Sequence, residues 1–124
     1  MNPSRILLVE DNFVSALING DFLRQWGFDV THAATADDAF AILGAGGPLD
    51  ALVTDIQLGP GANGFDVARA ARRAYPDLPV VITSGVRRER FPGELVEGAA
   101  FLAKPFHPLQ ILESLGADHE RAVA

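Results

Sequence analysis

Cysteine is absent from this sequence, and lysine occurs only once, as Lys104. Without cysteine the chain cannot form a disulfide framework or a thiolate metal site. No uninterrupted apolar run approaches the ~20 residues that span a bilayer, and the N-terminus has no apolar signal segment. We therefore expect a chain without membrane contact that resides in a reducing compartment, the cytoplasm.

Basic residues are scarce in general. Ten Lys and Arg residues stand against 16 Asp and Glu residues, which gives a formal net charge of −6. A chain of this sign repels the phosphates of nucleic acids, so direct nucleic-acid binding is not expected. Because Lys104 is the only lysine, its charge does not belong to a lysine-rich surface.

Short apolar runs alternate with helix-like segments along the whole chain. The runs that we assign to strands are residues 5–9, 28–33, 51–55, 80–84 and 99–103. Helices are expected at residues 13–26, 36–43, 65–75 and 108–115, with a short or irregular one within 86–98, where charged residues and a Pro-Gly pair interrupt the pattern. This alternation predicts an α/β fold with a doubly wound, five-stranded parallel sheet and five helices.

The length of 124 residues and the 48% hydrophobic content are enough for one core and too little for two. We therefore expect a single domain over residues 1–124, with its core at 4–116 and a loose C-terminal tail at 117–124.

The first helical segment has its large apolar residues at three- and four-residue spacing. This spacing predicts one buried stripe, formed by Val14, Leu17, Ile18, Phe22 and Trp26. The polar residues Asn19, Asp21 and Arg24 fall outside the stripe and are expected at the surface.

Distinctive polar residues follow four of the predicted strands. They are Glu10 with Asp11, Asp55, Ser84 and Lys104. Parallel strands bring their carboxyl ends to one edge of the sheet, so these side chains should converge there. Each pair of carboxylates would repel by ~1 kcal/mol at 4 Å in water and by ~4 kcal/mol at an effective dielectric constant near 20, so a cation is expected among them. Ligands that are all oxygen favour Mg²⁺.

Four motifs, taken together and in order, resemble the receiver domain of two-component response regulators. They are Leu8-Val9-Glu10-Asp11-Asn12, Val53-Thr54-Asp55, Pro79-Val80-Val81-Ile82-Thr83-Ser84 and Lys104-Pro105-Phe106. Each motif alone is weak, but the resemblance extends over roughly residues 4–116. It implies the flavodoxin-like receiver fold with strand order 2-1-3-4-5.

The resemblance also implies a role for each site residue. Asp55 is similar to the phosphate-accepting carboxylate of the family. Asp11 would bind Mg²⁺ directly, Glu10 mainly through water, and Gln57 through its backbone carbonyl. Lys104 would pair with a phosphoryl oxygen, and the bond that follows it, to a proline, is a candidate cis peptide.

Two further positions resemble the family's switch residues. Thr83 and Ser84 are adjacent, and alternation along a strand lets only one of them approach Asp55. The family's hydroxyl residue lies five places after the proline that opens the strand, and counting from Pro79 selects Ser84. Phe101 stands where the family has an aromatic residue that reports phosphorylation, and without a hydroxyl it would respond by packing alone.

The chain departs from the family pattern at two places. Gly64 lies nine residues beyond Asp55, one more than is commonest, which enlarges a glycine-rich loop beside the site. The stretch from Ser84 to Lys104 is about two residues shorter than is typical, so the fourth helix is expected to be abnormal. That helix belongs to the usual partner surface, which leaves partner identity and a homodimer open.

The leading hypothesis is a stand-alone, single-domain receiver that takes a phosphoryl group onto Asp55 from a histidine kinase or a histidine phosphotransfer protein. It would signal to a downstream protein by phosphorylation-dependent binding, without enzymatic activity beyond self-phosphotransfer and autodephosphorylation. The alternatives are a phosphorelay intermediate or phosphate sink, and the receiver of a hybrid histidine kinase. A small-molecule phosphohydrolase is disfavoured, because it usually has a second acid two residues after the nucleophile, where this chain has Gln57. A degenerate receiver is disfavoured because no site residue is missing.

Overall fold

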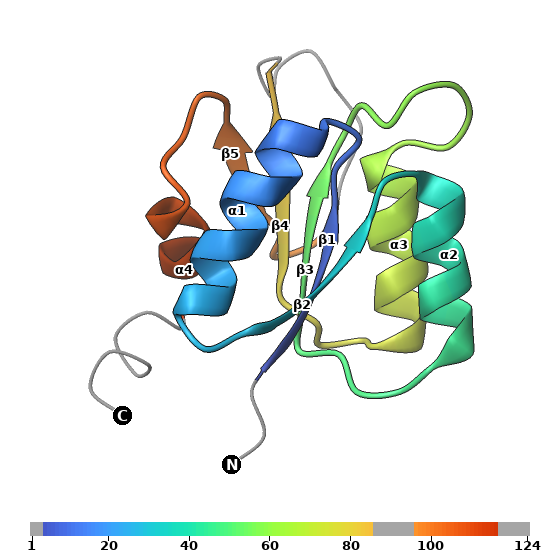
Figure 1. Ribbon diagram of the computed structural model, residues 1–124. Helices are drawn as coiled ribbons and strands as arrows, with labels where there is room; N and C mark the ends of the chain where they lie inside the picture. The colour runs from blue at the N-terminus through green and yellow to red at the C-terminus, as the bar shows by residue number, and fades with distance from the viewer. Residues whose placement is uncertain (1–3, 86–95, 117–124) are drawn as a thin grey trace.

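The computed structural model describes residues 4–85 and 96–116, which form one parallel sheet between two layers of helices (Figure 1). The five strands are β1 (Arg5–Val9), β2 (Asp29–Ala33), β3 (Ala51–Asp55), β4 (Val80–Ser84) and β5 (Ala100–Ala103). Their order is β2-β1-β3-β4-β5, and every neighbouring pair is parallel. The predicted doubly wound sheet and its strand order are confirmed.

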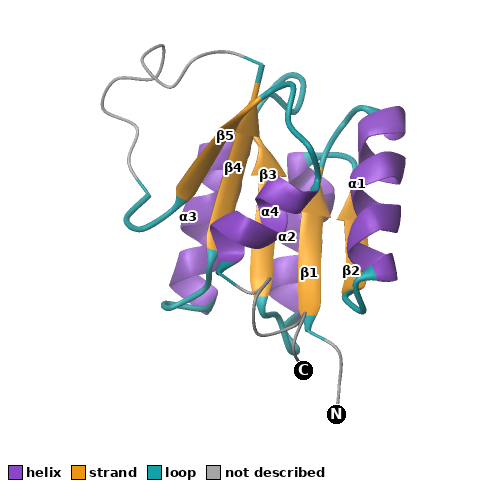
Figure 2. Cartoon of the chain, turned by 90° about the vertical axis from the view of Figure 1, so that its left-hand side faces the viewer, coloured by secondary structure: helices purple, strands orange, loops and turns teal. Residues whose placement is uncertain are grey.

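Four helices lie within the described ranges. They are α1 (Phe13–Gln25), α2 (Ala36–Ala45), α3 (Gly64–Ala74) and α4 (Leu109–Leu115). Helices α1 and α4 cover one face of the sheet, and α2 and α3 cover the other (Figures 1 and 2). Most of the irregular helix predicted within 86–98, and the predicted tail at 117–124, lie outside the described residues. Within the described part of the chain, no helix has the length and apolar character that crossing a membrane requires.

The sheet supplies side chains to two separate hydrophobic cores, because successive residues of a strand point to opposite faces. Leu7, Leu52 and Ile82 pack toward α2 and α3. Leu8, Val53 and Val81 pack toward α1 and α4. All of these side chains are almost fully buried, which explains why the central strands are continuous apolar runs and not alternating ones.

The strand register aligns the residues that leave the sheet at its carboxyl edge. Val9 pairs with Thr54, so the next step along each strand places Glu10 beside Asp55. Ser84 pairs with Ala103, and the backbone N–H of Lys104 donates to the carbonyl of Ser84 at 2.8 Å. Glu10, Asp55 and Lys104 therefore arrive at the same edge from three different strands.

The predicted buried face of α1 is wrong for Val14, Leu17 and Ile18, whereas Phe22 and Trp26 are partly buried against the core, as predicted. Phe13, Val14, Leu17 and Ile18 are 72%, 61%, 49% and 56% exposed. The residues of α1 that face the sheet are Ala16, Asn19, Gly20 and Leu23. These residues also follow helical spacing, and their mostly small side chains let the helix lie close to the strands. Two faces of α1 thus show the helical repeat of 3.6 residues. The size of the apolar side chains favours the face that the structure leaves exposed.

Replacement of leucine by alanine at two positions of α1 tests this orientation. We expect Leu23→Ala to lower the free energy of unfolding by ~2–5 kcal/mol, because it leaves a cavity in the core. Leu17→Ala should change it by less than ~1 kcal/mol, because the side chain is half exposed. Urea denaturation measures both values, and an equal loss for the two variants would contradict the observed face.

Candidate phosphoacceptor site

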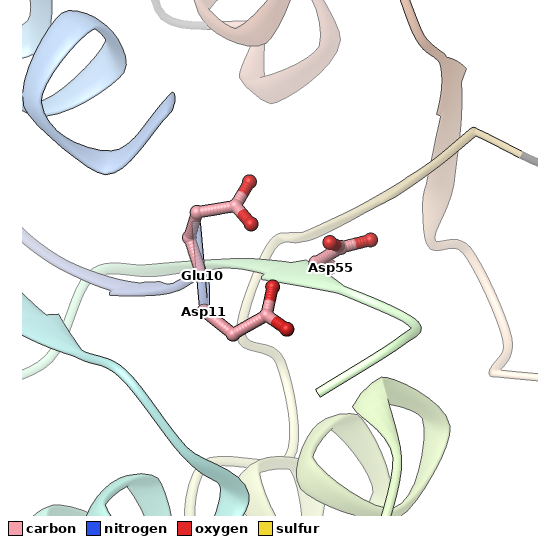
Figure 3. Close-up of side chains that lie close together, drawn as sticks. All are labelled: Glu10, Asp11 and Asp55. Carbon is pink, nitrogen blue, oxygen red and sulfur yellow. The ribbon is translucent and has the colours of Figure 1, made fainter. Parts of the chain in front are cut away.

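Three carboxylates meet at the carboxyl edge of the sheet, as the sequence predicts (Figure 3). Glu10 and Asp11 follow β1, and Asp55 is the last residue of β3. One oxygen atom from each carboxylate lies within 4.8 Å of the other two. We call these three residues the acidic cluster.

The ammonium of Lys104 bridges two members of the acidic cluster. Its Nζ lies 3.1 Å from Oε1 of Glu10 and 3.1 Å from Oδ2 of Asp55. The side chains of Glu10 and Asp55 are only 4% and 8% exposed, and that of Lys104 is 28% exposed. Carboxylates this buried require a paired positive charge, and Lys104 supplies it. The peptide bond from Lys104 to Pro105 is cis, as predicted.

Glu10 is held by β2 and by the start of α1. Its backbone N–H donates to the carbonyl of Ala33 at 3.0 Å, and its own carbonyl lies 2.8 Å from Nε2 of His32. Because a carbonyl only accepts, Nε2 of His32 is the donor. The other carboxylate oxygen of Glu10, Oε2, accepts from the backbone N–H of Asn12 at 3.2 Å. Asn12 also caps α1 by accepting from the backbone N–H of Ser15.

The support from His32 is a site contact that sequence reasoning missed. His32 has no ligand spacing in the sequence, and only the pairing of Leu8 with His32 between β1 and β2 brings it next to the acidic cluster.

Burial and neighbouring charges set the titration of the two buried partners. Burial raises the pKa of the Glu10 carboxyl, and the charge of Asp55 raises it further, against the hydrogen bonds from Asn12 and Lys104. Burial alone would lower the pKa of Lys104, but its hydrogen bonds to Asp55 and Glu10 and their negative charges outweigh this effect and raise it. Three carboxylates lie near one ammonium, so the site carries an excess of negative charge that favours the binding of a cation.

Glu10→Gln tests this excess through the pH dependence of stability. A raised pKa means that folding favours the protonated carboxyl of Glu10, so its stabilising contribution is present below the ordinary value of ~4.3 and is lost as pH rises through the folded pKa. Without divalent cations, we expect Glu10→Gln to be more stable than the natural chain at pH 7, by a margin that shrinks toward pH 4. Urea denaturation across this range measures the margin.

Glu113→Gln, at an exposed position of α4, is the control for the loss of a carboxylate. A Glu10→Gln variant that is less stable than the natural chain at pH 7 would contradict the interpretation.

Gly64 lets the start of α3 touch the end of β3. Its backbone N–H donates to the carbonyl of Ile56 at 2.8 Å. A Cβ at position 64 would overlap the backbone carbonyl oxygen of Asp55 and lie 2.9 Å from Cα of Ile56. Asn63 and Asp66 form a reciprocal capping box that fixes the same turn of the helix. The enlarged loop thus closes on Asp55 through a contact that only glycine allows.

Gly64→Ala should therefore destabilise the chain by ~1–3 kcal/mol or more and displace Asp55, because backbone and not a flexible side chain would have to move. Gly44→Ala is the matched control, since Gly44 lies within α2 with open space around its Cβ position. That substitution should stabilise by ~0.5–1 kcal/mol. Equal stability of the two variants in urea would rule out the close contact at Gly64.

The other predicted site residues belong to β4, to β5 and to the turn after β3. Ser84 is fully buried at the end of β4. Thr83 pairs with Asp55 in the register, and alternation therefore places Thr83 on the same face of the sheet as Asp55. Phe101, in β5, is partly buried against the α2–α3 core, and Gln57 is exposed in the turn after β3. The switch roles of Ser84 and Phe101 and the metal-binding role of Gln57 stay predictions.

Comparison with known proteins finds the same arrangement elsewhere. The model of the response regulator receiver domain family matches residues 6–116. A structure of a response regulator receiver protein from Sinorhizobium medicae superposes with a TM-score of 0.88 at 30% identity, covering 96% of this chain and 97% of that one. A response regulator from Burkholderia pseudomallei with a phosphorylated aspartic acid and a calcium ion gives a TM-score of 0.81 at 26% identity, covering 97% and 72%.

The curated relatives are longer proteins. The sensor kinase CckA of Brucella abortus is 31% identical over 109 residues, which are 86% of this chain and 11% of that protein. This chain spans between 11% and 49% of the length of three curated relatives that it matches.

Proposed function

The chain belongs to the response regulator receiver domain family, and we propose on this basis that it takes a phosphoryl group onto Asp55 from a histidine kinase or a histidine phosphotransfer protein. The observation that carries the proposal is the position of Asp55 at a strand end, 3.1 Å from the ammonium of Lys104 and within 4.8 Å of two further carboxylates. We treat the described residues as one receiver domain that acts in the cytoplasm.

The geometry supports Asp55 as the nucleophile. A carboxylate oxygen of Asp55 would form a bond to phosphorus while the bond between phosphorus and the donor's imidazole nitrogen breaks, and the electron pair of that bond returns to the imidazole. Lys104 already contacts Asp55, so its charge lies where phosphoryl oxygens would arrive. The chemistry is self-modification and its reversal, and the domain is a signalling element without turnover of other substrates.

The donor atoms of the acidic cluster fit Mg²⁺, because all of them are carboxylate oxygens. Asp11, which is exposed, and Asp55 would hold the ion directly, together with the backbone carbonyl of Gln57. Both oxygens of Glu10 already accept hydrogen bonds, from Lys104 and Asn12, which supports contact of Glu10 with the ion through water. The ion would neutralise charge between the carboxylates and an incoming phosphoryl group.

The output of the domain would be a change in what its surface binds. Phosphorylation of Asp55 would draw in the hydroxyl of Ser84 and change the packing of Phe101 in β5. A downstream protein would then bind to the surface that these changes alter. A role as a phosphorelay intermediate or as the receiver of a hybrid kinase is the second candidate, and the similarity to a segment of the much longer sensor kinase CckA favours it.

Incubation with a small phosphodonor, acetyl phosphate, and Mg²⁺ tests the nucleophile directly. We expect intact-mass measurement to show one added phosphoryl group that is labile and depends on Mg²⁺, and we expect none on Asp55→Asn. Asp37→Asn, at an exposed position of α2, should behave as the natural chain. An adduct that persists in Asp55→Asn would show that another residue is the acceptor.

The choice of switch hydroxyl is tested by Ser84→Ala and Thr83→Val. If Ser84 is the switch, Ser84→Ala should still accept phosphate but lose the shift of the Phe101 ring signals that phosphorylation causes in NMR spectra. Thr83→Val should keep that shift. The reverse result would assign the role to Thr83, which shares a face of the sheet with Asp55.

A further inference from the structure

Thr54 is a polar residue within an apolar layer of the sheet. It lies in β3, it is fully buried, and its partners in the strand register are Val9 of β1 and Ile82 of β4. Both partners belong to the core that packs against α2 and α3. A valine would fill the same space without a hydroxyl, and a hydroxyl that leaves water is costly unless it makes a hydrogen bond. The role of this hydroxyl therefore lies in the hydrogen bond that it makes.

The hydroxyl of Thr54 donates to the backbone carbonyl of Asp55 at 2.9 Å. The last residue pair of the ladder between β1 and β3 joins Val9 to Thr54, so this carbonyl lies one residue beyond the ladder. The same carbonyl oxygen lies against Gly64 at the start of α3. The hydroxyl thus gives the carbonyl a donor at the point where the pairing of the two strands ends.

The peptide unit between Asp55 and Ile56 is held at both of its polar ends. Its carbonyl, which belongs to Asp55, accepts from Thr54, and its N–H, which belongs to Ile56, donates to the carbonyl of Thr83 at 3.0 Å. The next carbonyl, that of Ile56, accepts from the N–H of Gly64 at 2.8 Å. Because a peptide unit is planar, hydrogen bonds at its two ends fix its rotation and with it the backbone conformation of Asp55.

The rotation of this peptide unit determines where two groups of the site lie. The carboxylate of Asp55 extends from the residue at one end of the unit, and its Oδ2 lies 3.1 Å from Nζ of Lys104. Gln57 follows the residue at the other end. A rotated unit would move the carboxylate of Asp55 relative to the carbonyl of Gln57, and both are proposed to hold Mg²⁺.

We propose that Thr54 is a positioning residue of the phosphoacceptor site. Its hydroxyl holds the peptide unit after Asp55 and thereby keeps the carboxylate of Asp55 and the carbonyl of Gln57 in a fixed relation for metal binding and phosphoryl transfer. Thr54 contacts neither the ion nor the phosphoryl group, because alternation along β3 places its side chain on the opposite face of the sheet from that of Asp55. This inference rests on the proposed function.

Amide hydrogen exchange in the metal-free protein tests the hold on the peptide unit. Thr54→Val removes the hydroxyl at nearly constant shape, whereas Thr54→Ser keeps the hydroxyl and removes the methyl group. The internal reference is the amide of Leu52, which belongs to the same strand and donates to the carbonyl of Pro79 at 3.0 Å. We expect the exchange rate of Ile56, relative to that of Leu52, to rise roughly two- to tenfold in Thr54→Val, the range of one net hydrogen bond.

The relative rate in Thr54→Ser should equal that of the natural chain. An unchanged relative rate in Thr54→Val, or an equal rise in both variants, would show that Thr54 acts through packing and would overturn the proposal.

Magnesium binding and phosphorylation are measured on the same variants. We expect isothermal titration calorimetry to show that Thr54→Val binds Mg²⁺ roughly two- to tenfold more weakly than the natural chain. The rate of phosphorylation by acetyl phosphate at subsaturating Mg²⁺ should fall by at least the same factor. Thr54→Ser should restore both quantities. Thr31→Val, the same substitution at an exposed position of β2, is the matched control and should alter neither.

The outcomes separate the positioning role from the proposed function. Natural Mg²⁺ affinity and natural phosphorylation rate in Thr54→Val, or equal losses in Thr54→Val and Thr54→Ser, would overturn the positioning role and leave the proposed function standing. Absence of phosphorylation in the natural chain would instead overturn the proposed function.

Discussion

The ammonium of Lys104, held between the carboxylates of Glu10 and Asp55, is the interaction that makes the acidic cluster possible. Two carboxylates this buried would repel strongly in a low-dielectric setting without a positive charge between them. The register of the parallel strands places Glu10, Asp55 and Lys104 at one edge of the sheet, at the ends of β1, β3 and β5. The positive charge of Lys104 would also attract the oxygens of an incoming phosphoryl group. The same position of Lys104 therefore serves both the stability of the site and the proposed chemistry.

Two hydrogen bonds and one close backbone approach hold the carboxylate residues of this ion pair in place. The carbonyl of Glu10 is fixed by His32, its carboxylate by the N–H of Asn12, and the end of β3 by the close approach of Gly64. Each support comes from a different neighbouring element. Displacement of any one element would move a carboxylate relative to Lys104, so the site depends on the packing of the whole carboxyl edge and not on the charged residues alone.

The strands and the acidic cluster could be predicted from the residues, because buried parallel strands are continuous apolar runs and their polar ends must converge. The strand order came from the resemblance to the receiver family. The orientation of α1 could not be predicted, since its small residues and its large apolar residues both repeat with helical spacing, and only packing chooses between them. The role of His32 depends on strand register, which local sequence does not contain. The burial of Asn19 could not be predicted either, because it depends on which face of α1 packs against the sheet.

The central claim about the site is that Lys104 is bound by Glu10 and Asp55, and the presence of a single lysine allows a direct measurement. In a sample with ¹⁵N-labelled lysine, the only ammonium signal from lysine belongs to Lys104. Its NMR titration should give a pKa above the ordinary ~10.4 that falls in Asp55→Asn; a pKa at or below that value, unchanged in the variant, would contradict the claim.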